Sequence, residues 1–140
     1  KAWRTDGYFT VGDAGYLDAD GYLFLCDRKA DMIISGGVNI YPAEIESVLS
    51  GHPRVLDVAV FGIPDDDWGE QVKAVIELEG DEPAPEGFDQ ELVAWAREQL
   101  AGFKVPRSID FVDRLPREDN GKLKKRLLRD PYWEGKDRQI

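Results

Sequence analysis

The sequence predicts a small α+β domain in which helices pack on a three-stranded antiparallel or mixed sheet, preceded by a β-hairpin. Short apolar runs with the two-residue alternation of strands are mixed with stretches whose apolar residues recur every three to four positions. Glycine and proline separate these runs. Because strands and helices do not alternate regularly, a doubly wound parallel sheet is not expected.

A β-hairpin is expected over residues 15–26. The pair Asp20-Gly21 supplies residues that a tight hairpin turn favours, and aromatic residues stand on both sides of it. A polar stretch over 27–31 follows. This stretch is either a simple turn or the joint between two domains.

Two short strands are expected next, over 32–34 and 38–41. Between them lie Gly36 and Gly37. Adjacent glycines at this point indicate unusual backbone angles or the close approach of another backbone or a ligand.

A helix is expected to begin at Pro42, because proline suits the first helical turn. Ile45, Val48 and Leu49 would share one face of it. Gly51 is expected to end this helix.

The second half of the chain adds three strands and two helices. Apolar runs predict strands over 55–63, 71–78 and 109–112, and the second of these has the alternation of a half-buried strand. Apolar residues recurring at every fourth position predict a helix over 88–101. A short basic helix is expected over 122–129.

The composition is acidic, with 28 Asp and Glu against 18 Lys and Arg and a formal net charge of -10. General binding to nucleic acids or anionic membranes needs a positive surface, so neither is expected. The charge is uneven, however, because cationic residues gather over 117–129. This local excess indicates either a small anionic ligand or simply a solvated helix face.

The sulfur and imidazole groups indicate structural roles. The single cysteine, Cys26, lies in an apolar run and is interpreted as a buried thiol. The single histidine, His52, follows a helix end, where a structural role is favoured over a general base. One Cys and one His do not make a credible zinc site. No apolar run approaches the roughly 20 residues that span a bilayer, and no signal peptide is seen, so a cytoplasmic location is expected.

Lys122 directly follows Asn120-Gly121 at the expected start of the basic helix. An ammonium group on a flexible stem near helical N–H groups can meet a phosphate or carboxylate. Such a glycine–lysine step is usually only a turn, and the spacing of a phosphate-binding P-loop is absent.

Taken together, the chain resembles the end of the adenylate-forming superfamily, which comprises acyl- and aryl-CoA synthetases, luciferases and peptide-synthetase adenylation domains. The similarity covers nearly the whole chain in the family's order and is most specific over residues 27–46. The matching segments are 7–13, 15–23, 27–46, 62–65, 68–70, 103–106 and 115–122.

The resemblance implies two half-reactions: ATP and a carboxylate form an acyl-adenylate and pyrophosphate, and coenzyme A then attacks the adenylate to give a thioester. It also implies that residues 1–27 are the tail of a large N-terminal domain and residues 28–140 a C-terminal lid that rotates between the two steps. The chain is therefore expected to be a fragment that is inactive alone, with Mg²⁺ bound alongside ATP in the missing domain.

Three residues are implied to act in adenylation. Asp13 matches the carboxylate that accepts hydrogen bonds from the ATP ribose, and Arg28 matches the arginine that also holds this ribose. Lys122 matches the lysine that reaches the carboxylate and α-phosphate, where a cation stabilises developing charge.

Other residues are implied to serve the lid rotation and the thioester step. Ala30 stands at the hinge position. Gly36 and Gly37 match the segment that lines the pantetheine channel, where missing side chains let a thin ligand pass. Phe103 resembles an aromatic residue that stacks on the adenine of coenzyme A in some relatives; simple packing is the alternative interpretation.

The sequence departs from the family pattern at three positions. Val11 replaces the usual threonine before Gly-Asp, and Ala30 replaces the usual aspartate or lysine. Val105 stands where a relative can place a basic residue for a coenzyme A phosphate, a contact for which Lys104 or Arg107 is a possible substitute.

The residues of the segment 32–42 resemble those of medium- or long-chain fatty acyl-CoA and aryl-CoA synthetases. We therefore expect a ligase that activates a carboxylic acid, most simply a fatty acid. Two alternatives stay open at this point. One is the lid of a peptide-synthetase adenylation domain, and the other is a stand-alone module that binds an anionic or protein ligand through the basic stretch.

Overall fold

The structure, a computed structural model, describes residues 12–136. Its elements follow one another as β1 (Asp13–Leu17), β2 (Leu23–Arg28), β3 (Ile33–Ser35), β4 (Val38–Ile40), α1 (Pro42–Ser50), β5 (Val55–Asp65), β6 (Gly69–Leu78), α2 (Phe88–Arg97), the 3-10 helix η1 (Gly102–Lys104), β7 (Ser108–Val112), α3 (Lys125–Arg129) and the 3-10 helix η2 (Asp130–Trp133). The predicted α+β class and the leading hairpin are confirmed. The departure at Val11 lies outside the described residues.

The sheet has five strands among the described residues, in place of the expected three. Strands β4, β3, β6 and β5 follow in that order, and β7 pairs in parallel with β6. The short strands β3 and β4 were predicted, but they also join the sheet, because Ser35 pairs with Gly69 at the start of β6. One edge of β6 thus holds β3 at its beginning and β7 further along.

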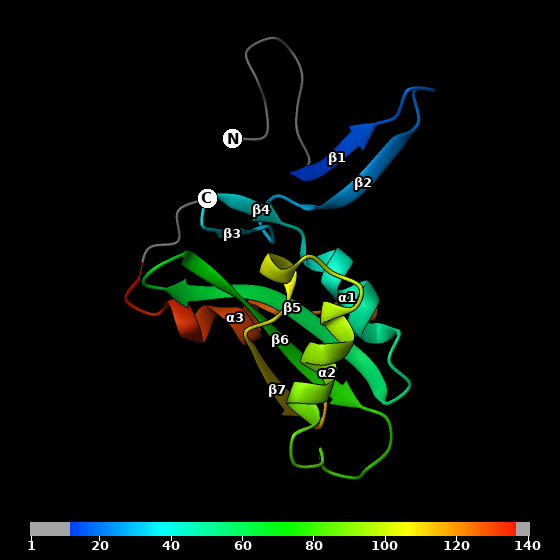
Figure 1. The fold of residues 1–140 in the computed structure, drawn as a ribbon, viewed down its shortest axis with the longest axis vertical. Helices are drawn as coiled ribbons and strands as arrows, with labels where there is room; N and C mark the ends of the chain where they lie inside the picture. The colour runs from blue at the N-terminus through cyan, green and yellow to red at the C-terminus, as the bar shows by residue number, and fades with distance from the viewer. Residues whose placement is uncertain (1–11, 137–140) are drawn as a thin grey trace.

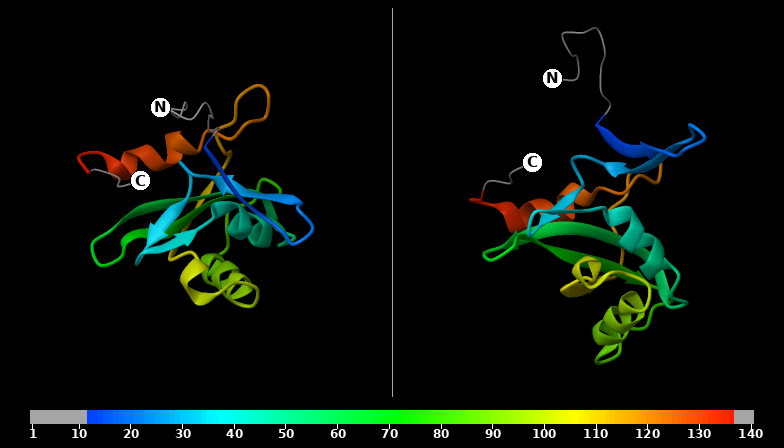
Figure 2. Two further views of the ribbon diagram at one scale, coloured as in Figure 1. Left: turned by 90° about the horizontal axis from the view of Figure 1, so that it is seen from above. Right: turned by 45° about the horizontal axis from the view of Figure 1, so that its top comes forward.

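Helices cover both faces of this sheet (Figures 1 and 2). On one face, alternate residues of β5 and β6 such as Val60 and Ala74 pack with the buried residues of α1 and α2. On the other face, Phe61 and Val75 pack with Leu115 and with Leu128 of α3. Strands buried on both faces become nearly continuous apolar runs, which explains why β6 is not half-buried as the sequence predicted.

Two predicted helices are shorter in the structure. The helix expected over 88–101 ends at Arg97, and Leu100 is buried just beyond it, in the turn that leads to η1. The basic helix begins at Lys125 and not at Lys122, because residues before it form a tight turn closed by a bridge between Arg117 and Leu123. None of the described helices is long and apolar enough to cross a membrane.

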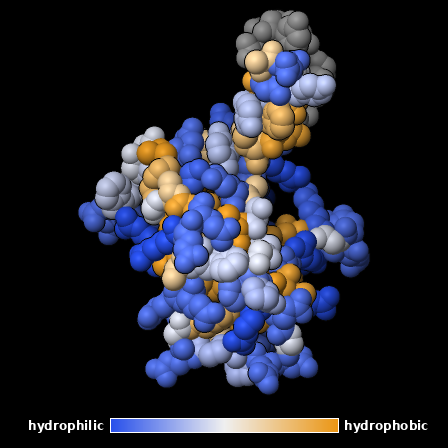
Figure 3. Space-filling model, turned by 45° about the vertical axis from the view of Figure 1, so that its right-hand side comes forward, coloured by the Kyte–Doolittle hydropathy of each residue, from blue (hydrophilic) through white to orange (hydrophobic). Residues whose placement is uncertain are grey.

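The β1–β2 hairpin stands away from the sheet (Figure 1). It touches the rest at its base, where the backbone N–H of Ala43 in α1 donates to Asp27 Oδ2 at 3.0 Å. Large apolar and aromatic side chains are exposed on it, and Figure 3 shows orange, hydrophobic residues on the projecting part. They are Tyr16, Leu17, Tyr22, Leu23, Phe24 and Leu25. Cys26 lies on the same projecting hairpin and is only partly buried, which corrects its interpretation as a buried thiol.

Candidate functional site

A cationic pocket of about 500 Å³ lies between the end of β2 and the segment 118–130, which includes α3; we call it the basic pocket. It contains six cationic and three acidic residues in a chain of net charge -10. Its lining residues are Arg28, Ala30, Asp31, Glu118, Lys122, Leu123, Lys124, Lys125, Arg126, Leu127, Arg129 and Asp130. A positive pocket on an acidic body favours a small anionic ligand over a merely solvated helix face.

Three of the residues singled out in the sequence meet here, namely Arg28, Ala30 and Lys122. Asp13 does not line the pocket, but it lies next to it, because Asp13 and Arg28 are opposite each other in the β1–β2 pairing. Asp13, Arg28 and Lys122 are all exposed, so their side chains are open to a ligand.

Lys122 lies in a turn and not at the start of a helix, which corrects the sequence-based placement. The backbone N–H of Gly121 donates to the carbonyl of Glu118 at 2.8 Å, and that of Lys122 donates to Asn120 Oδ1 at 2.9 Å. Gly121 has φ of +83°, a value that favours glycine. An anion at Lys122 would therefore meet the ammonium charge of the lysine and not the N–H groups of a helix end.

Ala30, the position predicted as the hinge, is contacted by Arg129 at the end of α3. Arg129 Nη1 donates to the carbonyl oxygen of Ala30 at 3.3 Å and lies 3.6 Å from Asp31 Oδ1. The backbone N–H of Asp31 donates to the carbonyl of Arg28 at 3.0 Å, which closes a turn around Ala30. A contact made by the Ala30 backbone is available whichever side chain occupies this position.

A second, smaller pocket of about 200 Å³ lies at the start of β6; we call it the glycine pocket. It shares no residue with the basic pocket. Its lining residues are Ser35, Gly36, Val38, Trp68, Val72, Gly102, Phe103, Val105 and Arg107. Two residues predicted for coenzyme A, Gly36 and Phe103, thus meet in it, whereas Gly37 is adjacent and outside the lining.

The ring of Phe103 is 54% exposed, so it does not serve as core packing. Val105 is buried and cannot present a charge. Of the two suggested substitutes, Arg107 lines the pocket. Lys104 is outside the lining, and its ammonium group pairs with the Glu44 carboxylate at 2.7 Å.

Sequence reasoning missed Trp68 as a site residue. Its ring lies over Gly36, where an added Cβ would be 2.7 Å from Trp68 Cε3, and Arg107 Cζ lies 5.6 Å from its ring centre. The backbone N–H of Gly36 also donates to the Trp68 carbonyl at 2.8 Å. The only signal was that the segment 68–70 belongs to the family resemblance.

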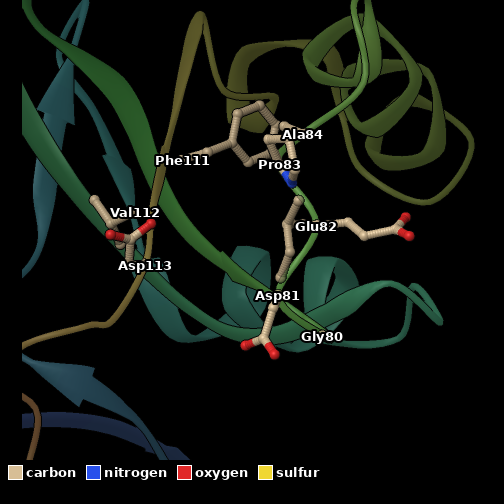
Figure 4. A pocket seen from close by; sticks show the side chains of 9 residues that line it. Gly80, Asp81, Glu82, Pro83, Ala84, Phe111, Val112 and Asp113 are labelled. Carbon is tan, nitrogen blue, oxygen red and sulfur yellow. The ribbon is translucent and has the colours of Figure 1, made fainter.

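A third pocket, of about 420 Å³, lies between β7 and the loop that follows β6 (Figure 4). The Phe111 ring faces Pro83, while the carboxylates of Asp81, Glu82 and Asp113 point in separate directions. No group of three potential metal ligands gathers within the described range 12–136. None of the predicted site residues lines this pocket.

His52 has a structural role, as expected. The imidazole is buried and makes edge contacts with Phe88 and Trp95, at ring-centre distances of 5.4 and 5.1 Å. Its Nδ1 accepts a hydrogen bond from the backbone N–H of Arg54 at 3.3 Å. It lines neither the basic nor the glycine pocket.

The fold is that of the small C-terminal domain found in the adenylate-forming superfamily. The chain belongs to the family of AMP-binding enzyme C-terminal domains, whose model matches residues 44–122. Within the superfamily, the similar proteins are mainly acyl- and aryl-CoA ligases.

Two curated relatives are similar over most of this chain. A fatty acid–[acyl-carrier-protein] ligase, ScoC, of Streptomyces coeruleorubidus is 46% identical over 136 residues, covering 96% of this chain and 25% of its own length. A feruloyl-CoA synthase of an Amycolatopsis species is 51% identical over 124 residues, covering 89% and 25%.

Among solved structures, the o-succinylbenzoate CoA synthetase MenE of Bacillus subtilis, in complex with its acyl-adenylate intermediate, superimposes with a TM-score of 0.79. It is 42% identical, and the match covers 91% of this chain and 25% of that one. The chain thus spans about a quarter of the length of the proteins that it matches.

Proposed function

We propose that this chain is the C-terminal lid of an ATP-dependent, AMP-forming acyl-CoA synthetase that activates a carboxylic acid, most simply a fatty acid. The observation that carries the proposal is that Arg28, Ala30 and Lys122 line one cationic pocket. In this proposal, residues 1–27 belong to the large domain and residues 28–140 form the lid. ATP, the acid and coenzyme A are its substrates, and Mg²⁺ accompanies ATP in the large domain.

The basic pocket serves the first half-reaction. Asp13 accepts hydrogen bonds from the ribose hydroxyls, and Arg28 donates to the same sugar. Lys122 approaches the junction of carboxylate and α-phosphate, where negative charge builds up as the adenylate forms. A single preorganised donor of this kind is worth about 3–4 kcal/mol of transition-state stabilisation.

The glycine pocket serves the second half-reaction. In this proposal the thin pantetheine arm passes along Gly36 in the glycine pocket. The missing side chain lets the Trp68 ring lie against the backbone there, since an added Cβ would be 2.7 Å from Trp68 Cε3. Phe103 offers an exposed face to the adenine of coenzyme A, and Arg107 offers a cation to its phosphates. In this proposal the lid turns about Ala30 and presents the two pockets in succession, which fits their having no residue in common.

The exposed apolar side chains of the β1–β2 hairpin support the presence of a large partner domain. Contiguous apolar patches on a protein surface mark interaction sites. We assign this patch to contacts with the large domain of the same chain. Membership of the enzyme family also makes the stand-alone binding module the weaker alternative.

The test uses the full-length protein with Lys122→Ala. ATP–pyrophosphate exchange, which reports adenylation, should fall about 100-fold or more. Thioester formation from supplied acyl-adenylate should change little. Lys136→Ala, which removes a lysine outside both pockets, is the matched control. Equal losses in the two half-reactions would overturn the role of Lys122.

A second candidate acceptor is the thiol of a carrier protein, since ScoC is named as an acyl-carrier-protein ligase. A peptide-synthetase lid would also hand its acyl group to a carrier-protein thiol. Supplying the acyl-adenylate with coenzyme A in one reaction and a carrier protein in another separates the two. Faster transfer to coenzyme A supports the synthetase.

A further inference from the structure

The turn that carries Lys122 is fastened to β5 by the side chain of Arg117. Arg117 Nε donates to Asp57 Oδ2 and Nη2 donates to Asp57 Oδ1, both at 2.7 Å. The third nitrogen, Nη1, donates to the carbonyl oxygen of Gly121 at 2.5 Å. One planar group therefore binds both the sheet and the residue directly before Lys122.

The other hydrogen bonds of this turn are internal to it. The backbone N–H of Glu118 donates to the Lys122 carbonyl at 2.9 Å, and that of Lys124 donates to the Pro116 carbonyl at 2.8 Å. These bonds set the shape of the turn. Leu123 anchors the base of the turn by packing against the core on the face of the sheet that α3 covers. The Arg117–Asp57 contact fixes where the glycine–lysine step lies over the sheet.

Asp57 is itself held in a fixed orientation. Its Oδ1 accepts a hydrogen bond from the backbone N–H of Val58 at 2.9 Å. The pairing of β5 with β6 is irregular between Val55 and Asp57, so that Leu56 is an extra residue. Such bulges redirect the side chains that follow them. The local backbone of β5 thus directs the Asp57 carboxylate toward Arg117.

The geometry of the Arg117–Asp57 ion pair suits orienting the turn more than stabilising the fold. The side chains of Arg117 and Asp57 are 41% and 23% exposed, and ion pairs this open to water contribute little to folding. A bidentate fork nevertheless fixes direction, because two parallel hydrogen bonds admit one orientation of the planar guanidinium. Small errors in placing a reacting group have large kinetic effects.

We propose that Arg117 and Asp57 are a positioning pair that holds Lys122 for adenylation. This inference rests on the proposed function. Arg117 acts through the Gly121 carbonyl and has no contact with substrate. The pair serves the first half-reaction alone, because the residue that it positions, Lys122, lines the basic pocket and not the glycine pocket.

The test compares Arg117→Lys and Asp57→Asn in the full-length protein. Each should lower kcat for ATP–pyrophosphate exchange about tenfold, with KM for ATP little changed. Thioester formation from supplied acyl-adenylate should stay within about twofold. The two variants break the same fork from opposite sides, so one still tests the inference if the other fails to fold.

A double-mutant cycle separates positioning from simple structural support. If Arg117 acts through Lys122, adding Arg117→Lys to Lys122→Ala should cause no further loss of exchange activity. Arg54→Lys is the matched control, since Arg54 lies over the Phe88 ring at 4.7 Å and lines neither the basic nor the glycine pocket. It should leave exchange activity unchanged.

The outcomes distinguish this inference from the proposed function. A further loss in the Lys122→Ala background, or equal losses in both half-reactions, would overturn the positioning role. Full activity of both fork variants, with Lys122→Ala impaired, would overturn this inference alone. Full activity of Lys122→Ala would overturn both it and the proposed function.

Discussion

The guanidinium of Arg129 donates a hydrogen bond to the carbonyl oxygen of Ala30 at 3.3 Å, across 99 positions of sequence. The Arg129 side chain is only 12% exposed, and it also lies 3.6 Å from the Asp31 carboxylate. Helix α3, which is distant in sequence, therefore holds the proposed hinge through the side chain of Arg129. Any rotation about Ala30 has to break or carry along this contact.

Arg129→Ala should loosen the turn at residues 28–31. Losing a hydrogen bond of about 1 kcal/mol raises the population of the locally open turn about fivefold. Trypsin cleavage after Arg28 or Lys29, followed by mass spectrometry, measures this opening. Arg126→Ala is the control, because the Arg126 side chain on the same helix is 81% exposed. Equal cleavage rates for the two variants would contradict the prediction.

Gly36→Ala should destabilise the chain more than Gly37→Ala. Both glycines have positive φ, +57° and +79°, so both substitutions carry a backbone cost of about 1–2 kcal/mol. Only the Cβ at position 36 meets a neighbour, Trp68 Cε3 at 2.7 Å, whereas position 37 has open space. Overpacking adds about 1 kcal/mol or more. Urea denaturation measures the difference, and equal midpoints would argue against the Trp68 contact.

Leu92→Ala should lower the free energy of unfolding by about 3 kcal/mol, because Leu92 is fully buried between α2 and the sheet. Leu56→Ala, at a side chain that is 52% exposed, should cost less than about 0.5 kcal/mol. Urea unfolding followed by far-ultraviolet circular dichroism compares them. Similar losses would mean that α2 does not cover this core.

The 140-residue chain alone should catalyse no ATP–pyrophosphate exchange and should bind ATP weakly. The proposed adenylation site needs preorganised contacts from two domains, and this chain supplies only one set of them. Exchange assays with a panel of carboxylic acids, beside calorimetric titration with ATP, test this. Turnover by the isolated chain would refute the assignment of a separate large domain.

Much of the fold could be predicted because its signals are local. The turn at Asp20-Gly21 and the start of α1 at Pro42 depend on backbone preferences of a few residues. An apolar run marked β5 as a strand, and the alternation over 71–78 marked β6. The end of α2 was missed because Leu100 continues the apolar pattern after the helical backbone has stopped.

Family resemblance singled out the candidate site residues but not the residues that hold them in place. Lys122 and Arg28 stood out through family resemblance, whereas the partners that hold them are distant in sequence. Asp57 and Arg117 are 60 positions apart, and no pattern in the chain connects them. The contact between Trp68 and Gly36 could likewise not be predicted, because it forms only when the sheet brings the two residues together.

The sequence by itself determined which segments are strands, turns or helices and which side chains carry charge at the proposed site, because these properties depend on neighbours along the chain. Only the tertiary structure decided that Arg28 and Lys122 share one pocket and that Gly36 and Phe103 share another. The physical reason is that packing helices on both sheet faces brings together residues whose contacts no local preference encodes.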